Sequence, residues 1–306
     1  MKKDIVTLNE LEKEDFVCLF DLALELKKRE KMGVLDTFMA GRILGLIFDK
    51  HSTRTRVSFE AAMHKMGGSS IYMSPRDMQV ARAEPVKDTA RVLSRYIDAL
   101  AIRTYSQELI EEYARYSGIP VINALSDKYH PCQVLSDILT IIEKKGGYEG
   151  VRIAWVGDGN NVAHSWIMAA AALDLDLVLG CPEGYMPDED VLEAAEKRSG
   201  KQVYVTNDPF EAVSGADVIY TDVWASMGQE NEHSQRLAVF KPFQVNQALL
   251  DAASDDVIVM HCLPAHRGEE ITDDILEGPH SVVWDQAENK MHIHKAVLKS
   301  LILDNR

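Results

Sequence analysis

Residues 43–73 carry the clearest signal of the fold class, and they read ILGLIFDKHSTRTRVSFEAAMHKMGGSSIYM. The run ILGLIF at 43–48 is short, continuous and apolar, which is typical of a buried strand. Residues 57–66 have the period of an amphipathic helix, the glycine pair 67–68 ends it, and a second apolar run follows at 70–73. A strand, a helix and another strand in this order predict a parallel βαβ unit.

The same alternation continues through the rest of the chain. Further strands are predicted at 99–102, 121–122, 151–156, 177–179, 203–205, 218–220, 257–260 and 282–284. Helices are predicted at 86–96, 108–116, 131–145, 163–173, 188–197, 209–213 and 288–303. These elements predict an α/β protein with two doubly wound parallel-sheet domains. We place the junction in the helix at 131–145, which gives domains at 1–146 and 147–285 and a C-terminal helix, 286–306, that packs back on the first domain.

The composition is globular with an acidic surplus. The 306 residues include 33 Lys and Arg against 48 Asp and Glu, a net charge of −15. This balance argues against a nucleic-acid partner, although one small anion in a local basic pocket is compatible with it. The longest apolar stretch, 166–173, is far shorter than the roughly 20 residues of a membrane span. No secretory signal is found, and the four cysteines have no disulfide or zinc spacing, so we expect a cytoplasmic protein with no membrane partner.

The segment DKHSTRTR at 49–56 follows the first strand, at the position where ligands bind in such folds. Ser52 or Thr53 can cap the next helix, whose free N–H groups and dipole favour an anion. With the hydroxyl of Thr55 and the guanidinium of Arg54, the turn has the parts of a phosphate cradle. A simpler alternative is a well-capped helix with solvated arginines. Two arginines in a first turn oppose the helix dipole, however, and a bound dianion would reverse that cost.

Two further polar groups fall on the ligand side of the same predicted sheet. Arg103 follows a strand, and HPCQ at 130–133 places His130 and Gln133 at the start of a helix. Each group alone is a weak signal, because a histidine at a helix start is more often a structural cap. Together with STRTR at 52–56, they resemble the carbamoyl-phosphate site of the aspartate and ornithine carbamoyltransferase superfamily, and the match runs in order along the whole chain.

The second half resembles the ornithine branch of this superfamily. The resemblance rests on GDGNN at 157–161, DVWASMGQE at 222–230 and HCLPA at 261–265. It implies that the first domain binds carbamoyl phosphate and the second binds ornithine. The residue types agree, because Asp222 offers a negative charge to an ammonium group, while residues 224–230 include no Arg or Lys for a second carboxylate. The residues that would bind ornithine are Asn161, Asp222, Ser226 and Met227.

Cys262 has several interpretations. A buried cysteine is usually a small hydrophobic side chain, whereas a cysteine next to His261 suggests a covalent nucleophile. Adjacent residues on a strand point to opposite faces, so His261 is poorly placed to activate the thiol and we do not expect covalent catalysis. The resemblance implies instead that Cys262 lies beside the reacting amine and that the Leu263 backbone contacts substrate.

The resemblance implies transfer of the carbamoyl group of carbamoyl phosphate to the side-chain amine of ornithine, which gives citrulline and phosphate, in arginine biosynthesis or catabolism. No cofactor and no metal are expected, and putrescine or N-acetylornithine are alternative acceptors. The implied catalytic residues are Arg103, His130 and Cys262. The residues implied to bind carbamoyl phosphate are Ser52, Thr53, Arg54, Thr55, Gln79, Arg103, His130, Gln133, Cys262, Leu263 and Lys290.

Two of these residues carry further expectations. Lys290 stands where the family usually has arginine, so the charge is kept but the planar fork is lost. Gln79 ends the segment SPRDMQ at 74–79, which resembles a loop that reaches into a neighbouring subunit's site in this family. The resemblance therefore implies a homotrimer, or a multiple of trimers, with shared active sites.

Other functional classes fit the sequence less well. A nicotinamide dehydrogenase is suggested by GDG at 157–159, but Val162 replaces the third glycine of G-x-G-x-x-G and no acid directly follows the strand at 177–179. A periplasmic-type binding protein would carry an export signal, and none is found. Two groups of histidines raise the question of a metal site: His292 with His294, and His261 with His266 around the HCLP turn. A spacing of two on a helix puts side chains on different faces, and no HExxH motif or carboxylate partner pattern is found, so no metal is expected at either group.

Overall fold

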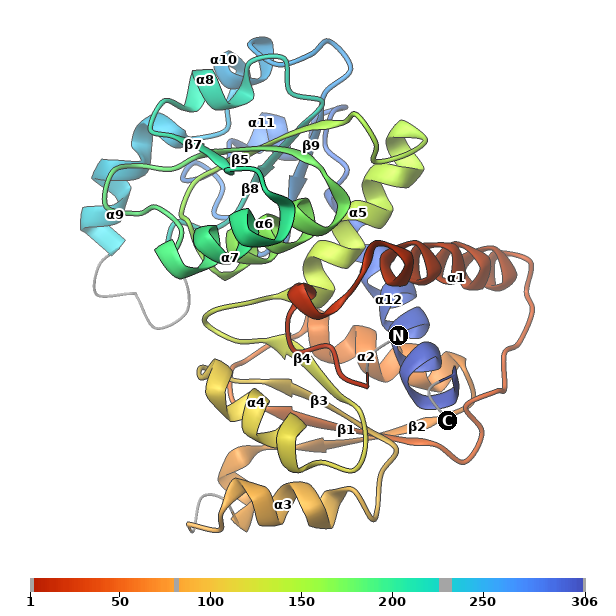
Figure 1. The fold of residues 1–306 in the computed structure, drawn as a ribbon. Helices are drawn as coiled ribbons and strands as arrows, with labels where there is room; N and C mark the ends of the chain where they lie inside the picture. The colour runs from red at the N-terminus through yellow and green to blue at the C-terminus, as the bar shows by residue number, and fades with distance from the viewer. Residues whose placement is uncertain (1–2, 80–82, 226–232, 305–306) are drawn as a thin grey trace. The chain divides into compact units, whose positions relative to one another are not determined.

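A computed structural model of the chain forms two compact units, unit 1 (Met1–Leu139 and Glu288–Arg306) and unit 2 (Thr140–Ala287). The structure describes residues 3–79, 83–225 and 233–304. Each unit is a parallel sheet with helices on both faces (Figure 1). The predicted α/β class with two doubly wound sheets is thus confirmed. Within the described ranges, no helix has both the length and the apolar character of a membrane span.

Unit 1 has a four-stranded sheet in the order β2-β1-β3-β4. Its strands are β1 (Ile43–Phe48), β2 (Ser69–Met73), β3 (Ala99–Arg103) and β4 (Val121–Leu125). Its helices are α1 (Lys13–Lys31), α2 (Arg54–Lys65), α3 (Val86–Leu93), α4 (Gln107–Tyr116), the first part of α5 (Pro131–Lys145) and most of α12 (Val283–Lys299). Short 3-10 turns lie at Leu8–Glu10 and Pro75–Asp77, and a π-helical turn at Ser300–Asp304 follows α12.

The strand order of unit 1 reverses next to β1. Ile47 of β1 pairs with Met73 of β2 on one side and with Ile102 of β3 on the other. One face of this sheet packs against α3 and α4. In open α/β sheets, ligands bind outside the carboxyl ends of the strands at such a reversal. This rule selects the loops that follow Phe48 and Arg103.

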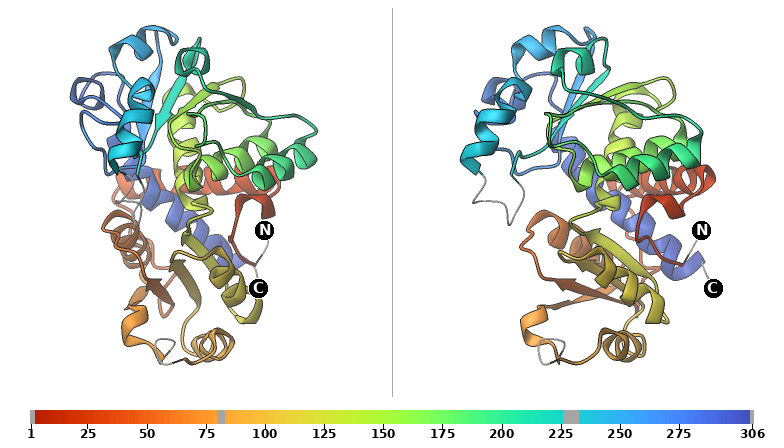
Figure 2. Two further views of the ribbon diagram at one scale, coloured as in Figure 1. Left: turned by 90° about the vertical axis from the view of Figure 1, so that its left-hand side faces the viewer. Right: turned by 60° about the vertical axis from the view of Figure 1, so that its left-hand side comes forward.

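The C-terminal helix packs on unit 1, as predicted. Lys27 of α1 donates to Asn289 Oδ1 of α12 (2.7 Å). The rings of Phe59 in α2 and His294 in α12 are stacked with centroids 3.5 Å apart. Figure 2 likewise shows α12 beside α1 and α2 within this unit. Residues more than 200 positions apart are thereby brought beside the first βαβ unit.

Unit 2 has a five-stranded sheet in the order β7-β6-β5-β8-β9. Its strands are β5 (Arg152–Val156), β6 (Asp176–Gly180), β7 (Tyr204–Thr206), β8 (Val218–Thr221) and β9 (Ile258–His261). Its helices are α6 (Asn161–Leu173), α7 (Glu189–Ser199), α8 (Pro209–Val213), α9 (His233–Phe240), α10 (Gln247–Asp251) and α11 (Asp273–Leu276), with a 3-10 turn at Lys241–Phe243. Helices α6 and α7 cover one face, and α8 and α10 cover the other (Figure 1). The order reverses between β5 and β8, which selects the loops after Val156 and Thr221.

Some elements differ from the prediction. The run at 282–284 is not a strand, because α12 begins at Val283 and only Ser281 forms an isolated bridge, to Val259. A run of three apolar residues is too short to distinguish a strand from a helix turn. Helices α1, α9, α10 and α11 have no counterpart among the predicted elements. The α1 signal was present in the sequence, since its buried residues recur at helical spacing, namely Phe16, Leu19, Phe20, Ala23 and Leu26.

Candidate active site

The basic turn after β1 lies at the reversal of the unit 1 sheet. The Asp49 amide donates to the carbonyl of Arg103 (2.8 Å), which joins the start of this turn to the end of β3. The Thr55 amide donates to Ser52 Oγ (3.2 Å), whereas the Thr53 side chain accepts no capping hydrogen bond. Ser52 is therefore the residue that caps this helix start, as one of the two predicted alternatives proposed.

Only one of the two first-turn arginines is committed to neighbouring side chains. Arg56 donates to Glu60 (3.0 Å) and lies over the ring of Tyr72, 3.6 Å from its centroid. Arg54 is exposed and makes no ion pair with the described residues. The nearby Lys50, which was not among the predicted site residues, is buried against Asp127 and lies 4.3 Å from the Tyr105 ring centroid. Arg54 is thus the cation of this turn that is available to an anion.

A buried polar group adjoins this turn, and we call it the basic cluster: Arg103, His130, Gln133 and Lys290. All four side chains are largely buried. Lys290 Nζ donates to Gln133 Oε1 (2.9 Å), and Gln133 Nε2 donates to Asp137 Oδ1 (2.8 Å). The Gln133 amide is therefore held by an oppositely charged group at each end, which fixes its orientation.

The charges of the basic cluster act on His130. Burial lowers the pKa of His130 well below its ordinary value, and Lys290, Arg103 and His294 lower it further. His130 is consequently neutral at physiological pH and can donate one hydrogen bond beside two permanent cations. Such an arrangement attracts an anion and can polarise a carbonyl oxygen.

The sequence suggested only a metal-binding role for His294. In the structure, this histidine packs against α2. Its Nδ1 lies 3.0 Å from Ser58 Oγ, and Ser58 Oγ also donates to the carbonyl of Thr55 (3.1 Å). Burial, followed by Lys290, lowers the pKa of His294 well below its ordinary value. This histidine therefore connects α12 to the first turns of α2. The sequence carries no signal for this contact, because His294 and Ser58 are 236 positions apart in the chain.

Within the described residues, Gln79 makes no hydrogen bond or ion pair with the basic cluster. It is exposed, and its carbonyl accepts from the amide of Glu84 (3.2 Å). Its predicted role needs a neighbouring subunit and remains a prediction.

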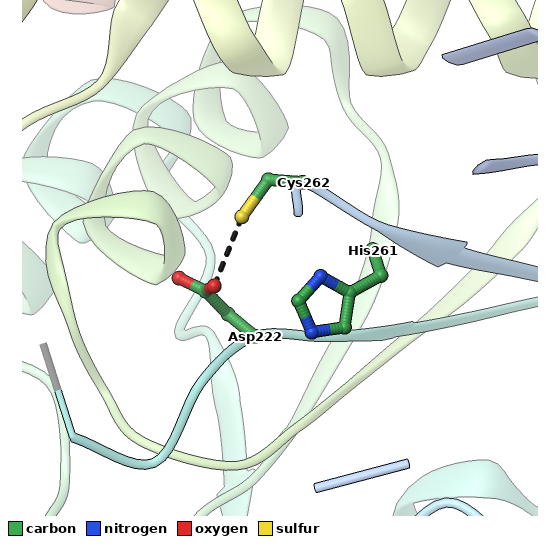
Figure 3. Close-up of side chains that lie close together, drawn as sticks. All are labelled: Asp222, His261 and Cys262. Atoms are coloured by element: carbon green, nitrogen blue, oxygen red, sulfur yellow. Dashed lines mark hydrogen bonds between the residues drawn. The ribbon is translucent and has the colours of Figure 1, made fainter. Parts of the chain in front are cut away.

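In unit 2, Asp222 stands directly after β8, and its carboxylate accepts three hydrogen bonds, of which Figure 3 draws the one from Cys262. Its Oδ1 accepts from Cys262 Sγ (2.9 Å) and from the Val223 amide (2.8 Å). Its Oδ2 accepts from Asn160 Nδ2 (2.9 Å). The carboxylate is largely buried and fixed, so it is suited to bind a cationic group.

Asn160 was not predicted as a site residue, although its neighbour Asn161 was. Asn160 Oδ1 caps α6 by accepting from the amides of Val162 (2.9 Å) and Ala163 (3.2 Å), while its Nδ2 is turned to Asp222. An asparagine between a strand and an apolar helix is an N-cap signal that could have identified it. Asn161 is the first residue of α6 and is half-buried.

The turn after β9 shows why His261 does not activate the Cys262 thiol. His261 Nδ1 accepts from the Leu263 amide (2.8 Å), and its Nε2 lies 3.0 Å from Glu270 Oε1. Both ring nitrogens are engaged, so His261 is unsuited to deprotonate Cys262. Leu263 has a positive φ of 58° and precedes a cis peptide bond. The thiol points instead to Asp222, as Figure 3 shows.

The remaining predicted residues of this half, Ser226 and Met227, lie outside the described residues. The segment that leads to them is anchored at Trp224, which is buried and packs against Phe240 with ring centroids 5.8 Å apart. Arg236 Nη1 donates to the Trp224 carbonyl (2.7 Å) and to Asp158 Oδ2 (2.9 Å). Trp224 is thus a packing residue.

The glycine-rich loop after β5 is packed by the chain itself. A Cβ added at Gly159 would lie 2.2 Å from the backbone nitrogen of Pro187, and the Gly159 amide donates to the Tyr185 carbonyl (2.9 Å). Gly159 is required by this close approach of two chain segments. The loop therefore needs no dinucleotide to explain its glycines, which weakens the dehydrogenase alternative.

Comparisons with known proteins agree with both halves. Residues 3–143 match the family model "Aspartate/ornithine carbamoyltransferase, carbamoyl-P binding domain", and residues 149–301 match "Aspartate/ornithine carbamoyltransferase, Asp/Orn binding domain". An ornithine carbamoyltransferase from Syntrophus aciditrophicus is 55% identical over 302 residues, which cover 99% of this chain and 100% of the relative.

Solved structures give the same result. The ornithine carbamoyltransferase of Pyrococcus furiosus has a TM-score of 0.94 at 50% identity, covering 98% of this chain and 96% of that one. The anabolic enzyme of Campylobacter jejuni has a TM-score of 0.92 at 39% identity, covering 99% of both chains. The fold, the two ligand loops of each unit and these full-length matches lead to one conclusion: the chain belongs to the aspartate/ornithine carbamoyltransferase family.

Proposed function

We propose that the protein transfers the carbamoyl group of carbamoyl phosphate to the δ-amine of L-ornithine, which gives L-citrulline and phosphate. The observation that carries the choice of acceptor is the fixed Asp222 carboxylate at the strand reversal of unit 2. It suits an ammonium group, whereas aspartate as acceptor would need extra cations for its second carboxylate. The full-length relatives named ornithine carbamoyltransferase support the same acceptor.

In unit 1, the basic turn at 49–56 binds the phosphate group of carbamoyl phosphate, and the basic cluster binds its carbamoyl group. The phosphate lies at the start of α2, where it accepts from the helix N–H groups and from four side chains: Ser52, Thr53, Arg54 and Thr55. Arg103 and His130, with Thr55, polarise the carbonyl oxygen. Gln133 accepts from the carbamoyl NH2 group, and Lys290 adds positive charge beside it.

In unit 2, Asp222 binds the α-ammonium group of ornithine, and Asn161 with Ser226 and Met227 completes the amino-acid ligands. Cys262 and the Leu263 backbone lie beside the reacting groups. Cys262 acts by orienting the amine and not as a nucleophile, because its hydrogen goes to Asp222 and His261 is engaged elsewhere.

The reaction follows from these positions. The lone pair of the neutral δ-amine attacks the carbonyl carbon, and the C–O π electrons move to the carbonyl oxygen, which Arg103 and His130 stabilise. The bond from carbon to the phosphate oxygen then breaks, and phosphate leaves with the electron pair and takes a proton from the new C–N ammonium. Binding next to fixed cations favours the neutral form of the amine.

We also propose that the protein is a cytoplasmic homotrimer, or a multiple of it, with shared active sites. Gln79 completes the carbamoyl-phosphate site of a neighbouring subunit, so the active unit is a homotrimer or a multiple of it. None of the four cysteines forms a disulfide with another described residue, which is compatible with a reducing cytoplasm. Sizing with light scattering tests the assembly, and a fully active monomer would contradict it.

An acceptor panel tests the reaction. Carbamoylated product is measured with carbamoyl phosphate and ornithine, putrescine, lysine, aspartate or N-acetylornithine. We expect a strong preference for ornithine, and preference for another amine would overturn the assignment. Arg103→Ala should lower kcat by at least about 10²-fold, whereas Arg91→Ala, an exposed arginine on α3, should leave it unchanged. Near-native turnover of the Arg103 variant would remove this residue from catalysis.

A further inference from the structure

Unit 2 contains a second group of ionisable side chains that the transfer reaction does not use. We call it the His/Glu cluster: His233, His266, Glu269 and Glu270. His233 is the first residue of α9, and the other three lie in the turn between β9 and α11. One nitrogen or oxygen ligand atom from each of His266, Glu269 and Glu270 lies within 4.8 Å of the others. We propose that this cluster binds a divalent transition-metal ion, with Zn²⁺ as the best fit.

The spacing of the side chains fits an ion better than it fits hydrogen bonds. His266 Nδ1 lies 3.6 Å from Glu269 Oε2 and 4.0 Å from Glu270 Oε2, and His233 Nε2 lies 3.5 Å from Glu269 Oε1. Hydrogen bonds between such atoms are normally shorter, about 2.7–3.2 Å. Ligand atoms at about 2.0–2.1 Å from a tetrahedral Zn²⁺ are roughly 3.3 Å apart, so a small contraction would complete the site.

Glu270 gives an independent indication. Its side chain is completely buried. Its Oε1 is paired with His261 Nε2 (3.0 Å) and accepts from the His266 amide (2.6 Å). Its Oε2 has no hydrogen-bond partner in the described part of the chain, and the nearest imidazole nitrogen of the cluster is at 4.0 Å. A buried carboxylate oxygen without a partner is costly, and a cation at this position would supply one.

The donor set selects the class of ion. Neutral imidazole nitrogens with carboxylate oxygens, and no thiolate, are typical Zn²⁺ ligands and also suit Co²⁺ or Ni²⁺. His266, Glu269 and Glu270 supply the protein ligands and a water supplies the fourth, while His233 lies against the other oxygen of Glu269. The side chains of His233 and His266 are 42% and 47% exposed, so an ion can reach the cluster from solvent. Because Glu270 also holds His261, the ion would be linked to the turn that carries Cys262.

Metal titration of the full, tag-free chain tests this site. The background variant is Cys18→Ser/Cys262→Ser, which removes the exposed thiol and the thiol that lies with Asp222 and His261 in a competing group. Isothermal titration with Zn²⁺ should give one saturable site. Co²⁺ should give the intense visible absorption of tetrahedral coordination, and Zn²⁺ should raise the Tm.

Ligand variants in this background separate the site from non-specific binding. His266→Ala and Glu269→Gln should each weaken Zn²⁺ binding at least about tenfold and abolish the Tm shift. Both residues are at the surface, so circular dichroism should show native folding. His64→Ala, which removes an exposed histidine on α2, is the matched control and should bind as the background does. No saturable binding, or equal affinity in the His266 and His64 variants, would overturn the proposal.

Discussion

Lys290→Met should separate the contribution of one buried charge to catalysis from its contribution to stability. Lys290 is 5% exposed and Gln133 is 2% exposed, and the lysine Nζ donates to the amide oxygen at 2.9 Å. Methionine keeps a long unbranched side chain but leaves that oxygen without its charged donor. The loss of one such bond should lower the free energy of unfolding by about 1–3 kcal/mol.

The effect on the reaction should be larger. Lys290 orients Gln133 and adds positive charge where the transferred group is proposed to lie, so its removal should cost about 10²–10³-fold in kcat/KM for carbamoyl phosphate, or about 3–4 kcal/mol. Lys290→Arg keeps the cation and should retain clearly more activity than the methionine variant. Because Lys290 also lowers the pKa of His130, the acid limb of the pH profile should move to higher pH in Lys290→Met.

The assay is steady-state formation of carbamoylated product as a function of pH, with urea unfolding of the same preparations. Lys295→Met is the matched control, because Lys295 is a buried lysine on the same helix that pairs with Glu30. It should lose stability but keep kcat/KM. The proposed role of Lys290 is contradicted if kcat/KM of folded Lys290→Met stays within about threefold of wild type, under 1 kcal/mol, or if Lys295→Met loses as much activity.

Three further outcomes are expected. Burial lowers the pKa of His292 to about 4 and those of His130 and His294 well below the ordinary value of 6.5, so the unfolded chain binds more protons below that value. Stability should therefore fall as pH drops from 7 to 5.5, by about 1 kcal/mol per histidine per pH unit, which urea unfolding measures. His292→Gln should reduce that slope, and an unchanged slope would contradict the assignment. Asn160→Ala should lower stability by about 1 kcal/mol through its lost helix cap and raise the KM for ornithine by freeing Asp222, whereas an unchanged KM would separate the cap from the site. Activity should rise from pH 7 to 9 as the ornithine amine becomes neutral, and a flat kcat profile would count against rate-limiting deprotonation.

Most of the fold could be predicted because its signals are local. Strand β1 and helix α2 each carry their own hydrophobic period, and the parallel βαβ topology then places the loops after β1 and β3 together. The candidate residues Arg54, Arg103 and Asp222 were found for the same reason, since Arg54 opens a helix, Arg103 is the last residue of a strand and Asp222 directly follows one. The strand predicted at 282–284 is wrong, because a run of three apolar residues is too short to show either a strand or a helix period.

The α/β class, the family and the loops that carry the chemistry can be read from the sequence, because strand and helix periods and loop motifs depend on residues close together in the chain. Which polar side chains share a site depends on the tertiary structure. Lys290 meets Gln133 across 157 residues, and Asn160 meets Asp222 across 62. Six polar side chains of α12 are buried, namely Gln286, Asn289, Lys290, His292, His294 and Lys295. A buried lysine or histidine is stable only when a partner from elsewhere in the chain satisfies it, and no local pattern records that partner.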